Sequence, residues 1–519
     1  MNPRIRHNDY STLKPANVGE WTPLLSVSVV VPAYGDQDKL DRTLAGLAGQ
    51  TYPSRLMEVV VVDDGTDPPL RLPEHVPERT RLVRSPAAGW GSAHARQFGA
   101  DLADGEVLQW LDADVVPSRE YVEAQVRWHH LADYLVVLGH LRFVPADLGD
   151  ASPDELFEAG SRMGRVADIL ERTDNLRRAD YDAYRLHVGA SGSVHARFFK
   201  AAGGMDTSLD LGSDTELGYR LAQAGAVFIP DQESRCWHLG ESRIQRRGKE
   251  VHRRNTPFIA QRIPFPRERR RHPNRQWLVP YVEVAVQAAD YEDTAATVDG
   301  FLASSIPDVR VTLTGPWNIL RARERRPFLD DPLLDLRMLH AAYEHEGRVR
   351  LAQGIDPGPT PVPFRLSCPA GWVPDFRSLR QLTDLATEHG YGLVSVDLGN
   401  GRTARLERTA ALARARLVGG DDLDRAIDDM FGATRVDGEE YGFAPQATAR
   451  KPWSQADESA MWKRVAERWM RDAGKWKAEA GAWQRKAEQR TTQGQAKGSP
   501  QLHKRVTELL KEFQRRTRS

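Results

Sequence analysis

The chain has 519 residues and a mass of 58.2 kDa, and its 72 basic and 72 acidic residues cancel in net charge. This length predicts about three domains or fewer, and the balanced charge gives no global field that would favour a nucleic-acid partner, so we expect none. No apolar run is long enough to cross a bilayer, which argues against an integral membrane synthase. The cysteines, Cys236 and Cys368, are too few for a disulfide framework, so we expect a reducing, cytoplasmic setting.

The first part of the chain alternates strand and helix patterns after an N-terminal extension, residues 1–22. The predicted elements are strand 27–31, a helix around 40–48, strand 59–62, strand 81–83, a helix around 93–102 and strand 107–111. This order predicts an α/β domain with a mainly parallel sheet. A dinucleotide-binding domain is the simplest alternative, but Pro32-Ala33-Tyr34-Gly35 stands where its glycine-rich motif would follow the first strand.

Acidic residues directly follow two of the predicted strands. Asp63-Asp64-Gly65 follows the strand 59–62, and Asp112-Ala113-Asp114 follows the strand that ends at Leu111. Ligands of open α/β sheets bind at the carboxyl ends of the strands, and hard oxygen ligands suit Mg²⁺ or Mn²⁺. The sequence therefore predicts a site for metal, phosphate or both. Asp36-Gln37-Asp38 and Asp422-Leu423-Asp424 match the same triplet pattern but follow no apolar strand.

A stretch rich in Arg and Pro, residues 252–276, predicts a boundary after the first domain, which we place at 23–265. At its centre lies Arg269-Arg270-Arg271-His272. Such a charge run indicates a solvated linker, or alternatively a contact with an anionic acceptor.

The region 276–435 carries a weak internal repeat of the first domain. The matching positions are Val29–Tyr34 with Val284–Ala289, Thr43-Leu44 with Thr297-Val298, Gly46 with Gly300, and Pro53 with Pro307. Leu313-Thr314-Gly315 stands where the first copy has Asp63-Asp64-Gly65, and no convincing metal triplet follows. We therefore expect a degenerate second α/β domain without chemistry of its own.

The C-terminal region predicts helices. A linker, 436–455, leads to a heptad segment, 456–490, and a short basic amphipathic helix at 501–519. The heptads indicate self-association as a homo-oligomer or docking on the protein's own domain. Because the segment is also basic, peripheral contact with the inner face of a membrane is the alternative. The repeated residues are Trp462, Trp469, Trp476 and Trp483, each followed four residues later by Ala.

The motifs of residues 26–240, taken in order, resemble those of glycosyltransferase family 2. They are Val29–Tyr34, Val61–Gly65, Ala95–Gln97, Leu111–Asp114, Gly203–Asp206, Ser213–Arg220 and His238. The resemblance implies a GT-A fold, which is a nucleotide-sugar-binding α/β domain, and makes the second domain GT-A-like. Ser213 departs from the family's usual Glu before the Asp, and Gln97 replaces its frequent Asn.

The resemblance also implies site residues. A divalent cation, Mn²⁺ or Mg²⁺, would be bound by Asp114, Asp112 and His238, and Asp214 would be the general base. The structural alternatives are a lone structural histidine at His238 and a helix N-cap at Asp214. The implied nucleotide-sugar-binding residues are Pro32, Ala33, Tyr34, Asp63, Asp64, Arg96, Asp112 and Ala113.

These expectations describe a metal-dependent inverting glycosyltransferase that uses a nucleotide-sugar donor, usually a UDP-sugar, to build a cell-surface glycan or polymer. The acceptor would be a glycan, polyol-phosphate or lipid-linked precursor. Gln245-Arg246-Arg247-Gly248 departs from the QxxRW motif of processive synthases. A non-catalytic nucleotide-sugar-binding or scaffold protein is the alternative. A sugar nucleotidyltransferase is a further one, although the glycine-rich basic loop it would need after the first strand is absent.

Overall fold

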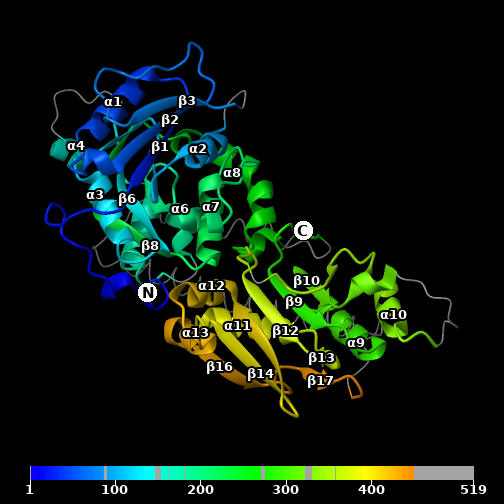
Figure 1. Ribbon diagram of the computed structural model, residues 1–519. Helices are drawn as coiled ribbons and strands as arrows, with labels where there is room; N and C mark the ends of the chain where they lie inside the picture. The colour runs from blue at the N-terminus through cyan, green and yellow to red at the C-terminus, as the bar shows by residue number, and fades with distance from the viewer. Residues whose placement is uncertain are drawn as a thin grey trace, which may run out of the picture. The chain divides into compact units, whose positions relative to one another are not determined.

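The computed structural model (Figure 1) describes residues 2–86, 91–146, 153–162, 164–179, 182–270, 275–321, 330–356 and 358–448. Residues 1–449 form one compact unit. The predicted heptad segment and the last amphipathic helix lie outside the described residues, so both stay predictions.

The first sheet has the strand order β3-β2-β1-β4-β7-β6-β8-β5. From β3 to β4 all neighbours are parallel, β7 is antiparallel to both β4 and β6, and β8 is parallel to β6. The predicted α/β fold with a mainly parallel sheet is confirmed. The strands are β1 (Val27–Ala33), β2 (Met57–Asp63), β3 (Thr80–Arg84), β4 (Val107–Trp110), β5 (Val115–Pro117), β6 (Leu135–Val144), β7 (Gly192–His195) and β8 (Val227–Leu239).

Helices cover both faces of this sheet, which explains why β1 is apolar at successive positions. Val29 and Val31 pack with the buried leucines of α1, whereas Val30 belongs to the core on the opposite face. The Asp36 carboxylate caps α1 by accepting from the backbone N–H of Lys39. The helices are α1 (Gln37–Ala48), α2 (Ser92–Leu102), α3 (Tyr121–His129), α4 (Pro153–Ala159), α5 (Gly164–Arg172), α6 (Ala196–Ala201), α7 (Ser213–Gln223) and α8 (Arg243–Arg262).

The second sheet, β11-β10-β9-β12-β15-β14-β16, repeats the topology of the first from β3 to β8. Both sheets show three parallel pairs, two antiparallel pairs and a final parallel pair. Its strands are β9 (Val282–Gln287), β10 (Val309–Thr314), β11 (Val349–Ala352), β12 (Phe364–Cys368), β14 (Leu393–Gly399), β15 (Arg402–Arg408) and β16 (Ala433–Asp437). A separate antiparallel pair is formed by β13 (Trp372–Pro374) and β17 (Phe443–Pro445). The helices are α9 (Tyr291–Leu302), α10 (Leu334–Tyr343), α11 (Ser378–Glu388), α12 (Thr409–Val418) and α13 (Leu423–Phe431).

Side-chain packing repeats together with the topology. A Cβ added to Gly46 on α1 would lie 2.8 Å from Cδ of Pro117 on β5. A Cβ added to Gly300 on α9 would lie 2.9 Å from Cδ of Pro374 on β13. In each copy the helix that follows the first strand approaches the short strand so closely that only glycine fits without displacement. The internal repeat read from the sequence is therefore also a repeat of packing.

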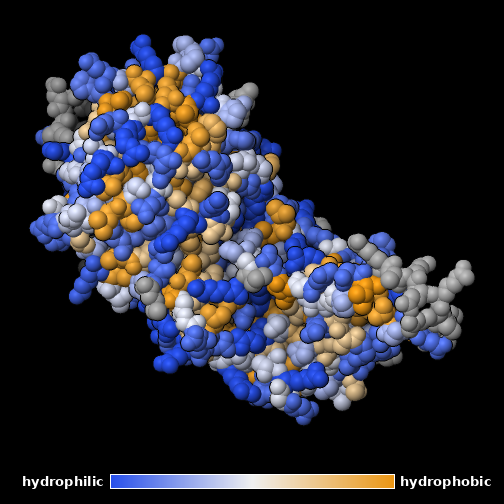
Figure 2. Space-filling model, in the orientation of Figure 1, coloured by the Kyte–Doolittle hydropathy of each residue, from blue (hydrophilic) through white to orange (hydrophobic). Residues whose placement is uncertain are grey.

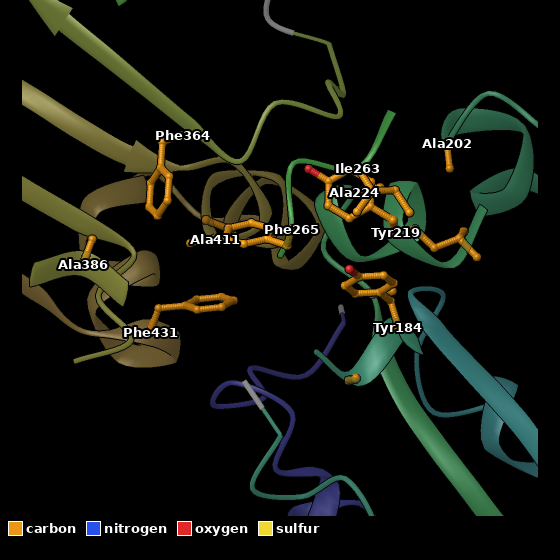
Figure 3. Packing of buried hydrophobic residues seen from close by; sticks show 14 of the residues in the cluster. Tyr184, Ala202, Tyr219, Ala224, Ile263, Phe265, Phe364, Ala386, Ala411 and Phe431 are labelled. Carbon is orange, nitrogen blue, oxygen red and sulfur yellow. The ribbon is translucent and has the colours of Figure 1, made fainter. Parts of the chain in front are cut away.

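The cores of the two sheets are continuous (Figure 3). Phe265 after α8 meets Tyr281 edge to face, and Tyr281 meets Phe364 of β12 in the same way. The buried Arg414 guanidinium of α12 donates to the carbonyl oxygens of Ile5 and His7 and to those of Gly225 and Ala226, which precede β8. One arginine of the second half thus joins the N-terminal extension to the first sheet.

Arg270 corrects one sequence interpretation. The charge run around it indicates a solvated linker or an acceptor contact, but the Arg270 side chain is buried. Its Nη1 lies 2.8 Å from the Asp308 carboxylate, and Nε donates to the Ala260 carbonyl. This partner is distant in sequence, so the local charge pattern could not reveal it.

Within the described residues, no helix is long and apolar enough to cross a membrane. Figure 2 shows hydrophilic side chains interspersed with smaller apolar areas over the face in view.

Candidate active site

A cleft of about 1010 Å³ opens at the carboxyl ends of β1, β2 and β4. This is where open α/β sheets bind ligands. All the predicted site residues except Asp63 line the cleft. Those that line it are Pro32, Ala33, Tyr34, Asp64, Arg96, Asp112, Ala113, Asp114, Asp214 and His238.

The structure separates the two neighbouring aspartates that follow β2. The buried Asp63 carboxylate accepts from the backbone N–H groups of Thr66 at 2.8 Å and Leu70 at 3.3 Å, so it holds the turn. Asp64 faces the cleft, and its Oδ1 is buried without a hydrogen-bond partner among the described residues. Burial raises the pKa of Asp64. Asp64 is therefore the better placed of the two to accept a hydrogen bond from a ligand.

Arg96 and Asp112 form a pair at the centre of the cleft. Nη2 of Arg96, on α2, lies 2.5 Å from Oδ1 of Asp112. The guanidinium packs against Gly189, where an added Cβ would lie 2.6 Å from Cζ of Arg96. The glycine thus leaves room for the arginine, a relation between distant residues that the sequence does not reveal.

Asp114 and His238 face each other because β5 pairs with β8 in the register Val115 to His238. Oδ2 of Asp114 lies 3.6 Å from Nε2 of His238 and 3.9 Å from Nζ of Lys39. The Gly240 carbonyl lies 3.1 Å from Nδ1 of His238 and orients the ring so that Nε2 faces Asp114. Burial raises the pKa of Asp114, and the neighbouring His238 opposes that rise.

The side chains at this end of the cleft match part of what the predicted cation requires. Carboxylate oxygens and a neutral imidazole nitrogen, oriented by a carbonyl, are the donor types that bind Mn²⁺ in proteins. Asp114 and His238 fit this requirement, whereas Asp112 points an oxygen at Arg96. In the part of the chain that the structure describes, no group of three or more His, Cys, Asp or Glu is arranged to hold a metal.

Asp214 lies in the first turn of α7, where it lines the cleft close to Gly189, the residue against which Arg96 packs. Its Oδ1 accepts from the backbone N–H of Thr215 at 2.8 Å, and Oδ2 lies 3.4 Å from the N–H of Gly189. The sequence left an N-cap role open for Asp214. The structure rules it out, because the N-cap of α7 is Gly212, with φ of +75°. One carboxylate oxygen is thereby positioned by the helix while the side chain still lines the cleft.

Sequence reasoning missed Lys39 and a set of cations on the far wall of the cleft. Lys39 lies at the third position of α1, where its ammonium approaches both Asp36 and Asp114. The only sequence signal was its position shortly after Pro32-Ala33-Tyr34. Arg162 and Arg165, at the start of α5, and Arg246 on α8 also line the cleft. No motif marks these three arginines.

Part of the chain is similar in sequence to a known protein family. Residues 28–199 match the sequence profile described as "Glycosyl transferase family 2". The match ends before Asp214 and His238, so the profile does not cover these two residues.

Two curated relatives illustrate the range of similar proteins. Over 233 residues the chain is 34% identical to "Validoxylamine A glucosyltransferase" of Streptomyces hygroscopicus subsp. limoneus, covering 41% of this chain and 51% of that protein. Over 328 residues it is 25% identical to "Hyaluronan synthase" of Pasteurella multocida, covering 56% of this chain and 33% of that protein. The chain thus spans about half or less of the length of these relatives.

Among solved structures, "GalNAc-T7 with UDP, GalNAc and Mn2+" is similar with a TM-score of 0.33 and 19% identity. The similarity covers 43% of this chain and 45% of that one.

Proposed function

We propose that the protein transfers a sugar from a nucleoside-diphosphate sugar to an acceptor hydroxyl, with inversion at the anomeric carbon; the match of residues 28–199 to the model of glycosyl transferase family 2 supports this. The observation that carries this proposal is the meeting of Asp112, Asp114, Asp214 and His238 in one cleft. The donor is a UDP-sugar. The product is a cell-surface glycan or polymer built on a glycan, polyol-phosphate or lipid-linked acceptor.

The donor's nucleoside lies against the wall formed by Pro32, Ala33 and Tyr34. The exposed Tyr34 ring offers a stacking face, and the unpartnered Oδ1 of Asp64 accepts from a base N–H or a ribose hydroxyl. Asp63 supports this wall through the turn that it holds. Arg96 is the guanidinium nearest the centre of the cleft, where it aligns Asp112 and meets a diphosphate oxygen.

The proposed reaction depends on Mn²⁺ or Mg²⁺. Asp114 and His238 would hold the ion, and Asp112 would reach it if Arg96 turned towards the diphosphate instead. A divalent cation supplies Lewis-acid stabilisation of the charge on a leaving diphosphate.

Asp214 acts as general base. Its carboxylate takes the proton of the acceptor hydroxyl while that oxygen forms a bond to the anomeric carbon and the bond from that carbon to the diphosphate oxygen breaks. The Thr215 N–H keeps the carboxylate oriented towards the cleft from the first turn of α7.

The test is a panel of nucleotide sugars with Mn²⁺, scored for release of nucleoside diphosphate. We expect release to stop with a chelator and to fall about 10²- to 10⁴-fold in Asp214→Asn, the usual contribution of a general base. Asp424→Asn is the matched control, because Asp424 lies in the first turn of α13, the helix that corresponds to α7. Release of pyrophosphate would instead identify a nucleotidyltransferase. If no donor released either product, the protein would be a non-catalytic binding or scaffold protein.

A further inference from the structure

The side of the cleft that lies away from the nucleotide wall is defined by the strand order. Pro32 lies at the end of β1 and Tyr34 follows it, Asp112 follows β4, and His140 lies on β6. Adjacent strands lie about 4.8 Å apart, so the three steps from β1 to β6 span about 14 Å. His238, the proposed metal ligand, pairs with Phe143 of β6, so the diphosphate also approaches this side. The acceptor is placed by the proposed base Asp214, which lines the same cleft.

Two arginines, one just before α5 and one in its first turn, line this side of the cleft. Nη2 of Arg162 donates to the Gln232 side-chain oxygen at 3.1 Å, and Arg165 lies exposed one turn later. His140 lies beside them, where burial and the positive charge of Arg162 lower its pKa to about 3. The imidazole is therefore neutral, and the arginines carry the positive charge of this wall.

A further arginine comes from α8. Arg246 is exposed and lines the cleft. Among the described residues, the side chains of Arg165 and Arg246 have no ion pair and no hydrogen bond. The next residue, Arg247, differs because it pairs with Glu250 and does not line the cleft.

The carboxylates on this side do not neutralise these arginines. Asp210 pairs with Arg254, and Asp231 pairs with Arg127. Glu241 is exposed and lines the cleft. Arg162, Arg165 and Arg246 therefore leave this wall with more positive than negative charge.

Building on the proposed sugar transfer, we infer that the acceptor carries an anionic group, phosphate or carboxylate, which Arg162, Arg165 and Arg246 bind on the β6 side of the cleft. The planar guanidinium donates two parallel hydrogen bonds to either kind of oxyanion. Unneutralised positive charges that face one cleft also raise the local concentration of an anionic substrate. The anionic group thus positions the acceptor hydroxyl at Asp214.

The test uses matched probes on one sugar frame, glucose 6-phosphate, glucuronate and glucose, observed by ligand NMR on the full chain in the presence of UDP and Mn²⁺. We expect one or both anionic probes to bind and glucose not to bind; the tighter anion identifies the group. Replacing Arg165 and Arg246 together by glutamine should weaken binding about tenfold or more, because each lost charge-assisted hydrogen bond has about that effect. Arg247→Gln, on the same helix with its charge already paired, should leave binding within about twofold.

Three results would overturn the inference. They are glucose binding as well as the anions, double-variant binding equal to wild type, and binding of the anionic probes only when UDP is left out, which would assign the arginines to the donor diphosphate. A thermal melt of each variant separates a lost site from a lost fold. Probe binding without release of nucleoside diphosphate from any donor would overturn the proposed transfer but leave the anion site standing.

Discussion

The two sheets of this protein share one topology, and among the described residues the acidic cleft lies at the first of them. Trp110 and Ser367 hold equivalent register positions, opposite Val30 and Ala285, and the short strand begins five residues later in both copies. Asp112-Ala113-Asp114 precedes it in one and Pro369-Ala370-Gly371 in the other. Register extends the comparison, since His238 pairs with Val115 and Pro445 pairs with Trp372. A shared backbone thus keeps the positions, and the side chains at a few strand ends decide whether they can do chemistry.

The helices that follow β1 and β9 show the same division between support and chemistry. Asp36 and Asp290 cap them in the same way, each accepting from the N–H three residues later. That third residue is Lys39 in the first copy, where it approaches Asp114, and Asp293 in the second, where it lies beside Gly371. The caps are alike because both helices need them, whereas the charge at the third position follows the presence of the acidic triplet.

The largest expected effect is a loss of stability at Arg414, a residue that connects the two halves of the protein. Arg414→Met should destabilise the protein by about 3–5 kcal/mol, because several buried carbonyl oxygens lose their donor. Urea unfolding followed by intrinsic fluorescence measures this change. If the second sheet supports the first, both should unfold at lower urea; loss confined to the second sheet would mean that the two halves are energetically independent.

The third residue of α1 and of α9 differs in charge between the two copies, and exchanging it tests whether that difference matters for the cleft. Lys39→Asp puts a third carboxylate near Asp36 and Asp114, and we expect nucleoside diphosphate release to fall about 100-fold, or about 2.7 kcal/mol. The reciprocal Asp293→Lys should leave release unchanged. Equal losses in the two variants would show that position 39 acts through helix stability and not through the cleft.

The paired glycines test whether equal packing has equal consequences. Gly46→Ala and Gly300→Ala should each destabilise the fold by about 1–2 kcal/mol, because the new methyl group meets a proline of the short strand. Calorimetric melting points give both values. Only Gly46→Ala should also raise the donor KM, since Pro117 lies three residues after Asp114 in the chain.

The smallest effect is expected at the counterpart of the proposed base. Asp424 forms an exposed ion pair with Arg405, so Asp424→Asn should change stability by less than about 1 kcal/mol. Release of nucleoside diphosphate should stay at the wild-type level. A large loss of nucleoside diphosphate release in this variant would place chemistry in the second sheet. It would contradict the conclusion that the first sheet alone carries the active site.

Sequence patterns predicted the fold well because they are local. Apolar runs placed β1, β2 and β4, and helical spacing placed α1 and α2, since each signal repeats over a few residues. The internal repeat was readable for the same reason, through residues such as Gly46 and Gly300 that pack alike in both copies.

The site was less accessible to prediction where geometry and not residue type mattered. Asp63 and Asp64 are identical in kind, and only the turn at Gly65, with φ of +91°, decides which carboxylate reaches the cleft. The local sequence predicts that Arg270 belongs to a solvated charge run. In the structure it is buried against Asp308, which is distant in sequence.

By itself the sequence determined that an α/β domain with acidic strand ends precedes a second copy lacking them, because alternating apolar patterns and strand-end residues are encoded locally. Tertiary structure alone decided that Asp114 faces His238, that Gly189 makes room for Arg96, and that Arg162 and Arg246 share one wall of the cleft. These relations depend on strand register and on helices packing across distant parts of the chain. No local pattern records them, since contacts between residues far apart in sequence form only when the whole domain folds.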